Sequence, residues 1–148
     1  EEEYALLYGD IGLGLTTWSP LASGLLSGKY RAGIPAGSRG AMENMAFLRD
    51  GLTHPARNAA VELLAPIAAD LGGSLAQLAI AWVLNNRLVN GVISGPRTLA
   101  QWLDYVAALA VEVTAEDERW VDQRVPPGHA STFGYTDPIY PVTGRVLA

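Results

Sequence analysis

The sequence lacks cysteine, a long apolar run and a basic N-terminal stretch, and each absence excludes a class of protein. Without cysteine, the 148 residues form neither disulfide bonds nor a thiolate metal site. The longest apolar candidate, Leu75 to Leu84, is about half as long as the roughly 20 residues of a membrane-spanning helix. The opening residues Glu1-Glu2-Glu3 do not resemble a signal peptide. We therefore expect a cytoplasmic protein with no membrane partner.

Charge is also scarce, at 17% of the residues, and the net charge is −5. Nucleic-acid binding needs a basic surface, so we expect no nucleic-acid partner. Apolar residues make up 49% of the chain, which is too high a share for a disordered protein. A small free-standing domain needs a mostly polar surface, so this surplus indicates that something else covers part of it. Because the chain also lacks an initiator methionine, we expect it to be a piece of a longer protein.

Apolar spacing and turn residues predict two strands separated and followed by helices. The expected elements are a helix end over 4–10, a strand over 11–19, an ordered apolar loop over 20–40, helices over 57–71 and 75–86, a strand over 91–94, a helix with an apolar face of Leu99, Trp102, Leu103, Val106 and Leu109, a short helix to about 123, and a tail over 125–148. Pro66 should kink the first long helix or shift its start. Ser74 with Gln77 and Thr98 with Gln101 have the spacing of capping boxes, and Thr114 with Asp117 caps the last short helix.

Two short strands, each followed by a capped helix, are typical of a parallel α/β sheet. The connection between them is well above the dozen or so residues that a parallel crossover requires. Two parallel strands alone would expose both edges and both faces of the sheet. The sequence therefore predicts one part of a larger α/β domain.

Acidic residues are absent from the two segments that follow the expected strands. The stretch 11–42 contains Lys29, Arg31 and Arg39 but no Asp or Glu, and the stretch 71–102 contains only Arg87 and Arg97 as charged residues. Ligands of parallel sheets bind at the carboxyl ends of the strands, and the last two loops of (β/α)₈ barrels often hold a phosphate. We therefore expect an anion site there. The alternative is a plain Gly-Pro turn with a solvated Arg97.

Trp18 at the end of the first strand has two interpretations. Aromatic residues at strand ends usually belong to the core, but Trp18 could instead offer its face to a planar ring. His54 and His129 have no ligand-spaced partners, so we expect no metal site. Neither a nucleophile elbow nor a phosphate-binding Walker loop occurs.

Three ordered blocks carry a resemblance to a known family: TWSPLASGLLSGKYRAGIPAGSR, SLAQLAIAWVL and VISGPRTLAQ. They resemble the aldo-keto reductases, in particular bacterial enzymes similar to potassium-channel β subunits. The resemblance covers essentially all of residues 1–148, with 125–148 as a C-terminal tail. It implies a (β/α)₈ barrel of which this chain is the C-terminal half, containing the last two strands and their helices.

The same resemblance implies a binding site for NADP(H), with Trp18 stacked on the nicotinamide ring. The pyrophosphate would be lined by Ser19, Pro20, Leu21, Ser23 and Gly24, with Lys29 and Arg39 reaching the cofactor phosphates. The adenosine 2′-phosphate end would be held by Gly95, Arg97 and Gln101, with Asp104 near the adenine. Tyr105 replaces the Asn that the family usually has. No residue matches the family's catalytic Tyr, Lys, His and Asp, which belong to earlier strands.

The resemblance thus implies an NADP(H)-dependent reductase of small aldehydes or ketones, and a chain that carries much of the cofactor site without catalysing by itself. The missing N-terminal half-barrel would be its partner. Whether the protein forms a homo-oligomer is left open by the sequence. One alternative is a non-catalytic NADPH-binding sensor or interaction subunit. Others are an inactive truncated gene product and a sugar-phosphate barrel, although Trp18 before Ser19-Pro20 suits a nicotinamide better.

Overall fold

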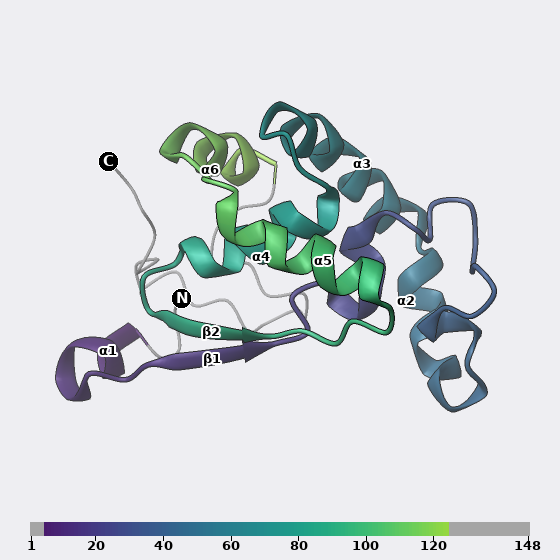
Figure 1. The fold of residues 1–148 in the computed structure, drawn as a ribbon, viewed down its shortest axis with the longest axis horizontal. Coiled ribbons are helices and arrows are strands. Elements are labelled where there is room, and N and C mark those ends of the chain that lie inside the picture. The colour runs from purple at the N-terminus through teal and green to yellow at the C-terminus, as the bar shows by residue number, and fades with distance from the viewer. Residues whose placement is uncertain (1–4, 125–148) are drawn as a thin grey trace.

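The computed structural model describes residues 5–124 and contains two strands and a series of helices (Figure 1). In chain order the elements are α1 (Ala5–Ile11), β1 (Leu15–Trp18), η1 (Ala22–Ser27), η2 (Arg39–Ala41), η3 (Glu43–Leu48), α2 (Arg49–Thr53), α3 (Pro55–Asp70), α4 (Leu75–Asn85), β2 (Val89–Ile93), α5 (Leu99–Ala107), η4 (Ala108–Ala110) and α6 (Ala115–Asp122), where η marks a short 3₁₀ segment. The predicted tail 125–148 lies outside the described residues, as does Tyr4 at the start of the predicted 4–10 helix.

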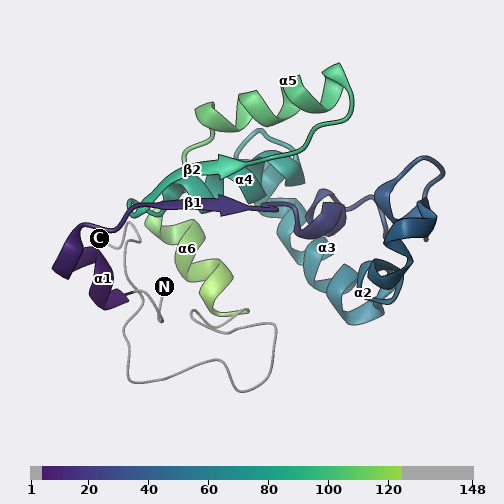
Figure 2. The ribbon, with the colours of Figure 1, turned by 90° about the horizontal axis from the view of Figure 1, so that it is seen from below.

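The two strands lie side by side and run parallel, as the sequence predicts (Figures 1 and 2). Trp18 at the end of β1 is level with Ile93 at the end of β2. Burial alternates along β1, where Leu15 and Thr17 are half-buried while Thr16 and Trp18 are exposed. Because neighbouring side chains of a strand point to opposite faces, one face of this sheet is covered and the other is open in the described part of the chain.

The strand boundaries differ from the predicted ones. The strand predicted over 11–19 begins only at Leu15, because Ile11 still belongs to α1 and Gly12 has a φ of +64°. The second strand begins at Val89, two residues before its predicted start. In the helix predicted over 57–71, Pro55 occupies the first turn, where proline fits well, and the helix continues through Pro66 to Asp70.

One of the two predicted capping boxes is confirmed, and the other forms only one of its two hydrogen bonds, while the predicted cap at Thr114 is a full capping box. Ser74 with Gln77 and Thr114 with Asp117 form both reciprocal hydrogen bonds. At α5 the Thr98 hydroxyl accepts the Gln101 N–H at 3.2 Å. The Gln101 side chain, however, accepts the N–H of Arg97 at 2.7 Å instead of that of Thr98. The glutamine thus reaches one residue further back and fixes the loop between β2 and α5.

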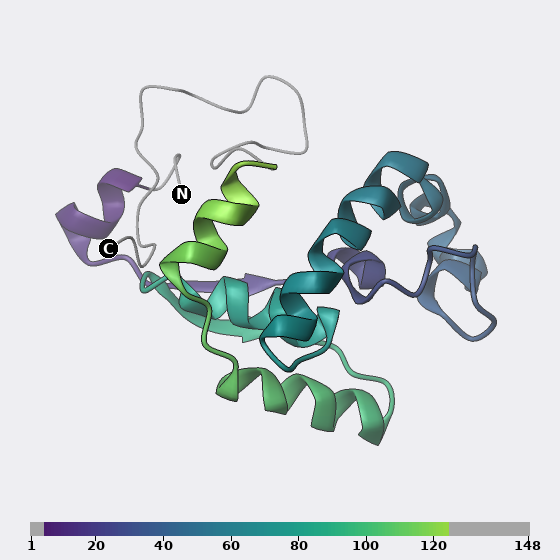
Figure 3. The ribbon, with the colours of Figure 1, turned by 90° about the horizontal axis from the view of Figure 1, so that it is seen from above.

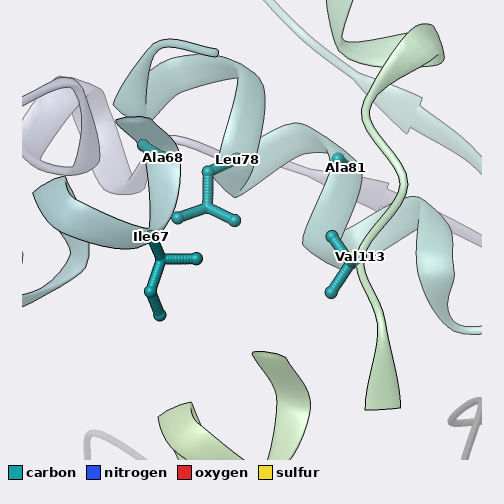
Figure 4. Close-up of a cluster of buried hydrophobic side chains, with 5 residues drawn as sticks. All are labelled: Ile67, Ala68, Leu78, Ala81 and Val113. Atoms are coloured by element: carbon teal, nitrogen blue, oxygen red, sulfur yellow. The ribbon is translucent and has the colours of Figure 1, made fainter. Parts of the chain in front are cut away.

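The buried core consists of three side-chain clusters that meet on α3 and α4. The first joins Ile67, Ala68, Leu78, Ala81 and Val113 (Figure 4). The others join Leu21, Ala76, Ile80 and Ala108, and Leu25, Tyr30, Leu52 and Val61. The second and third contain residues of the loop after β1, so this loop is ordered and packed, as predicted. Helix α4 contributes to two clusters, in agreement with its almost entirely apolar sequence.

The predicted apolar face of α5 exists, but it points to solvent. Leu99, Leu103 and Leu109 are 72%, 60% and 75% exposed, and Trp102 is 51% exposed. Helix α5 contacts α4 through its opposite side, which carries Asp104, while Ala108 just beyond the helix is buried. Figure 3 shows α5 along the outside of the molecule, away from α3 and α6. The described chain therefore leaves a large apolar surface uncovered.

Among residues 5–124, no single helix is long and apolar enough to span a membrane, and α3 with α4 meets this length and composition test only as a pair bent by 85°.

Candidate functional site

A pocket of about 570 Å³ opens at the carboxyl ends of β1 and β2. Its volume lies in the range of cavities that bind small molecules and cofactors. The walls come from the loop after β1, from the segment before η2, and from the loop between β2 and α5. The lining residues are Trp18, Ser19, Pro20, Leu21, Ser23, Gly24, Lys29, Pro35, Ala36, Gly37, Ser38, Arg39, Ile93, Ser94, Gly95, Arg97, Thr98, Gln101 and Tyr105.

The structure brings together every predicted site residue except Asp104. Residues far apart in the sequence meet here because both strands end at the same edge of the sheet. Sequence reasoning missed the wall formed by residues 35–38. These residues lie in the predicted acid-free stretch, but a Pro-Ala-Gly-Ser turn carries no ligand-specific signal of its own.

Trp18 does not belong to the core. Its side chain is 81% exposed, and Ile93, level with it on β2, is 59% exposed. The expectation that strand-end aromatics are buried is thus wrong for this residue. The indole face stands at the pocket, where it can stack on a planar ring.

The backbone directly after β1 is strained. Ser19, Ala22 and Ser23 have φ values of 57°, 47° and 61°, a left-handed region that costs residues other than glycine about 1–3 kcal/mol each. Gly24 follows with a φ of 97°, and a Cβ there would lie 2.9 Å from both Cε and Nζ of Lys29. Such strain gathers at ligand-binding sites, and here all of it lines or borders the pocket.

Three cations line the pocket without carboxylate partners. Lys29 follows η1, Arg39 begins η2 and Arg97 precedes α5, and no carboxylate of residues 5–124 lies within ion-pairing distance of them. The ion pair that the described chain does contain, between Arg49 and Glu43, does not involve the pocket. The acid-free segments therefore converge as predicted, and they leave an excess of positive charge that suits an anion.

Arg97 also connects two walls of the pocket. Its Nη1 donates to the carbonyl oxygen of Gly37 at 2.9 Å, sixty residues away in the sequence. A guanidinium has five N–H donors, and this bond uses one of them. The remaining donors make no hydrogen bond with residues 5–124, so Arg97 can hold the wall and an anion at once.

Ser38 is a pocket residue that the sequence did not single out. It is buried, yet its hydroxyl has no hydrogen-bond partner among the described residues. Buried hydroxyls are normally paired, but the Ser38 oxygen has almost no accessible surface, so a ligand in the pocket reaches it only if the wall moves. Its position directly before Arg39 is the signal that could have found it.

Asp104 makes contacts away from the pocket lining. The Ser74 hydroxyl donates to its two carboxylate oxygens at 2.9 and 3.1 Å, and Gln77 Nε2 donates at 2.7 Å. The carboxylate thus ties α5 to the N-terminus of α4, where the helix dipole favours a negative charge.

The neighbouring Tyr105 does line the pocket. Burial raises its pKa, and the Asp104 charge raises it further, while Arg39 lowers it.

Replacing Asp104 with alanine is expected to lower the free energy of unfolding by about 2–3 kcal/mol, because the mutation removes hydrogen bonds to a charged acceptor. Urea unfolding followed by circular dichroism measures the change. Asp70→Ala is the matched control, since Asp70 is exposed at the end of α3. Equal, small losses in both variants would show that Asp104 does not hold α5 in place.

Residues 5–124 contain no cluster of His, Asp or Glu that could hold a metal ion. His54 stands at the start of α3 and does not line the pocket, and His129 lies outside the described residues.

Comparison with known proteins adds two findings. A family model described as "Aldo/keto reductase family" matches residues 1–124. Similar curated proteins include a "Probable voltage-gated potassium channel subunit beta" from Oryza sativa subsp. japonica, 50% identical over 112 residues, and one of the same name from Arabidopsis thaliana, 46% identical over 112 residues. Each match covers 75% of this chain and 34% of the relative. The chain therefore spans about a third of the length of these relatives.

Proposed function

This chain belongs to the aldo/keto reductase family, and we propose that it is the C-terminal part of an NADP(H)-dependent reductase of small aldehydes or ketones. One observation carries the proposal: Lys29, Arg39 and Arg97 converge beside an exposed indole at the carboxyl ends of parallel strands, and no carboxylate of residues 5–124 pairs with them. A nicotinamide dinucleotide phosphate pairs several negative charges with a planar ring, so its chemistry matches this pocket.

The residues present fit this cofactor. Lys29 and Arg39 would neutralise the pyrophosphate. Arg97 stands at the N-terminus of α5, where free N–H groups also favour a phosphate. Trp18 would orient the nicotinamide ring, and when bound this ring supplies the hydride that reduces a carbonyl.

We propose that the rest of the reductase covers the open face of the sheet and the apolar stripe of α5. The family implies a closed (β/α)₈ barrel, and closure removes the strand edges that two strands leave unpaired. The exposed Leu99, Trp102 and Leu103 lie where a neighbouring strand and helix would pack. In this proposal the missing strands also supply the groups that protonate the carbonyl oxygen. The partner is thus the N-terminal part of a barrel.

A chimera tests this function. In it, the present chain replaces the matching third of the rice relative, and NADPH absorbance is followed with and without a small aldehyde or ketone. We expect a folded chimera that oxidises NADPH only when the carbonyl compound is present. A chimera carrying Arg97→Ala serves as the matched control and should need a higher NADPH concentration. A folded chimera that binds NADPH but never oxidises it would contradict the proposed reductase function.

A second candidate is favoured by the names of the relatives, both called potassium channel β subunits. In this alternative the pocket binds NADPH as a signal, and the completed domain serves as an interaction subunit. Binding without carbonyl-dependent oxidation in the chimera is the result that would favour this candidate over the reductase.

A further inference from the structure

Tyr30 is buried directly behind the pocket wall that carries Arg39. It is 1% exposed and packs with Leu25, Leu52 and Val61. Its hydroxyl oxygen accepts the backbone N–H of Gly40 at 3.2 Å, in a buried hydrogen bond that spans ten residues. Gly40 directly follows Arg39, so the bond fixes the backbone beside a cation of the pocket.

The backbone around Gly40 has little freedom to move. Its carbonyl oxygen accepts Nε of Arg49 at 2.9 Å, so both of its polar groups are bonded. A Cβ at Gly40 would lie 3.2 Å from Cε1 of Tyr30 and 3.2 Å from Cδ1 of Leu52. The glycine backbone therefore rests directly on the tyrosine ring. At the other end of the same wall, the carbonyl oxygen of Tyr30 accepts the N–H of Gly33 at 3.1 Å.

The ring and the hydroxyl of Tyr30 make two different contacts. Nζ of Lys29 lies 5.3 Å from the centre of the ring, within the range of a cation–π contact. The hydroxyl, in contrast, accepts the N–H of the peptide group that follows Arg39. Phenylalanine at this position would keep the ring beneath Lys29 and would remove only the bond to Gly40.

We propose that Tyr30 is a positioning residue, whose hydroxyl holds Arg39 toward the phosphates of the bound cofactor through the Gly40 N–H. A phenylalanine would fill the core equally well, so packing does not account for the hydroxyl. Without it the Gly40 N–H is buried and unpaired, and the wall must shift to satisfy that group. This inference rests on the proposed cofactor site and adds to it the residue that places one of its cations.

The test is a double-mutant cycle in the full chain. NADPH affinity is measured for the single variants Tyr30→Phe, Arg39→Ala and Lys29→Ala. It is also measured for the two double variants that combine Tyr30→Phe with Arg39→Ala or with Lys29→Ala. Inorganic pyrophosphate is the second probe. We expect Tyr30→Phe to weaken NADPH binding about three- to tenfold, as the loss of one hydrogen bond does. The loss should vanish in the Arg39→Ala background and persist in the Lys29→Ala background. Amide hydrogen exchange at Gly40 should become faster in Tyr30→Phe.

The outcomes separate this inference from the proposed function. An equal loss on Tyr30→Phe in both cation backgrounds would overturn the positioning role, because a general loss of structure acts without Arg39. Unchanged affinity in Tyr30→Phe would overturn it too. If the unmodified chain bound neither NADPH nor pyrophosphate, the proposed cofactor site would be wrong. The proposed role of Tyr30 would then be wrong too. If the unmodified chain bound NADPH but the effect of Tyr30→Phe did not depend on the cation at position 39, only the role of Tyr30 would be overturned.

Discussion

Replacing Arg97 with alanine is expected to weaken NADPH binding by about 1.5–3 kcal/mol, which is about ten- to a hundredfold, and to weaken NADH binding much less. NADH lacks the 2′-phosphate, so the difference between the two cofactors isolates the bond from the guanidinium to that group. The bond to Gly37 is lost with either cofactor and therefore cancels in the comparison. Isothermal titration of both cofactors into the chain and its variant measures the difference.

Arg87→Ala is the matched control for this prediction. Arg87 is an exposed arginine of the same acid-free stretch, but it does not line the pocket. Its replacement should leave both affinities unchanged. An equal loss of NADPH and NADH binding in Arg97→Ala would mean that Arg97 only holds the Gly37 wall and does not contact the 2′-phosphate.

The chain alone is expected to reduce no carbonyl compound, even when saturated with NADPH. Hydride transfer to a carbonyl leaves an oxyanion that needs a proton from a nearby acid. Among the described residues that line the pocket, Tyr105 offers a phenol and no His, Asp or Glu is present. Burial and the Asp104 charge raise the pKa of Tyr105, against the lowering by Arg39, so this phenol is a weaker proton donor than an ordinary tyrosine.

The measurement for this second prediction is the decay of NADPH absorbance with the chain alone and a small aldehyde or ketone. The rate should equal that of buffer, and Tyr105→Phe should not change it. Carbonyl-dependent oxidation by the chain that exceeds the buffer rate, and that Tyr105→Phe abolishes, would place a working acid in this chain.

Some features could be predicted from the sequence because they depend on neighbouring residues or on a general rule of parallel sheets. The caps at Ser74 and Thr114 follow from side chains that bond amides a few residues away. The convergence of Arg39 and Arg97 followed from the absence of acids after each strand, combined with the rule that parallel strands end at one edge. The role of each residue toward NADP(H) came from the family resemblance and stays a prediction.

Individual contacts between distant segments could not be predicted, although the meeting of the two loops could. The hydrogen bond between Arg97 and Gly37 joins two loops, and no local sequence pattern predicts it. The periodicity of α5 revealed its apolar stripe, but the side of the helix that packs depends on the bonds of Asp104 to α4. The left-handed conformation of Ala22 is likewise imposed by the surrounding structure, because alanine has no preference for it.

The most direct test of the cofactor pocket is a titration of the purified chain with NADPH and with NADH, followed by tryptophan fluorescence. Trp18 is exposed at the pocket, so we predict saturable quenching that is stronger and reached at lower concentration for NADPH. In Trp18→Phe most of the quenching should disappear while NADPH binding, measured by calorimetry, remains. The absence of saturable binding for either cofactor would contradict the account, because the converging cations would then not form a cofactor site in this chain.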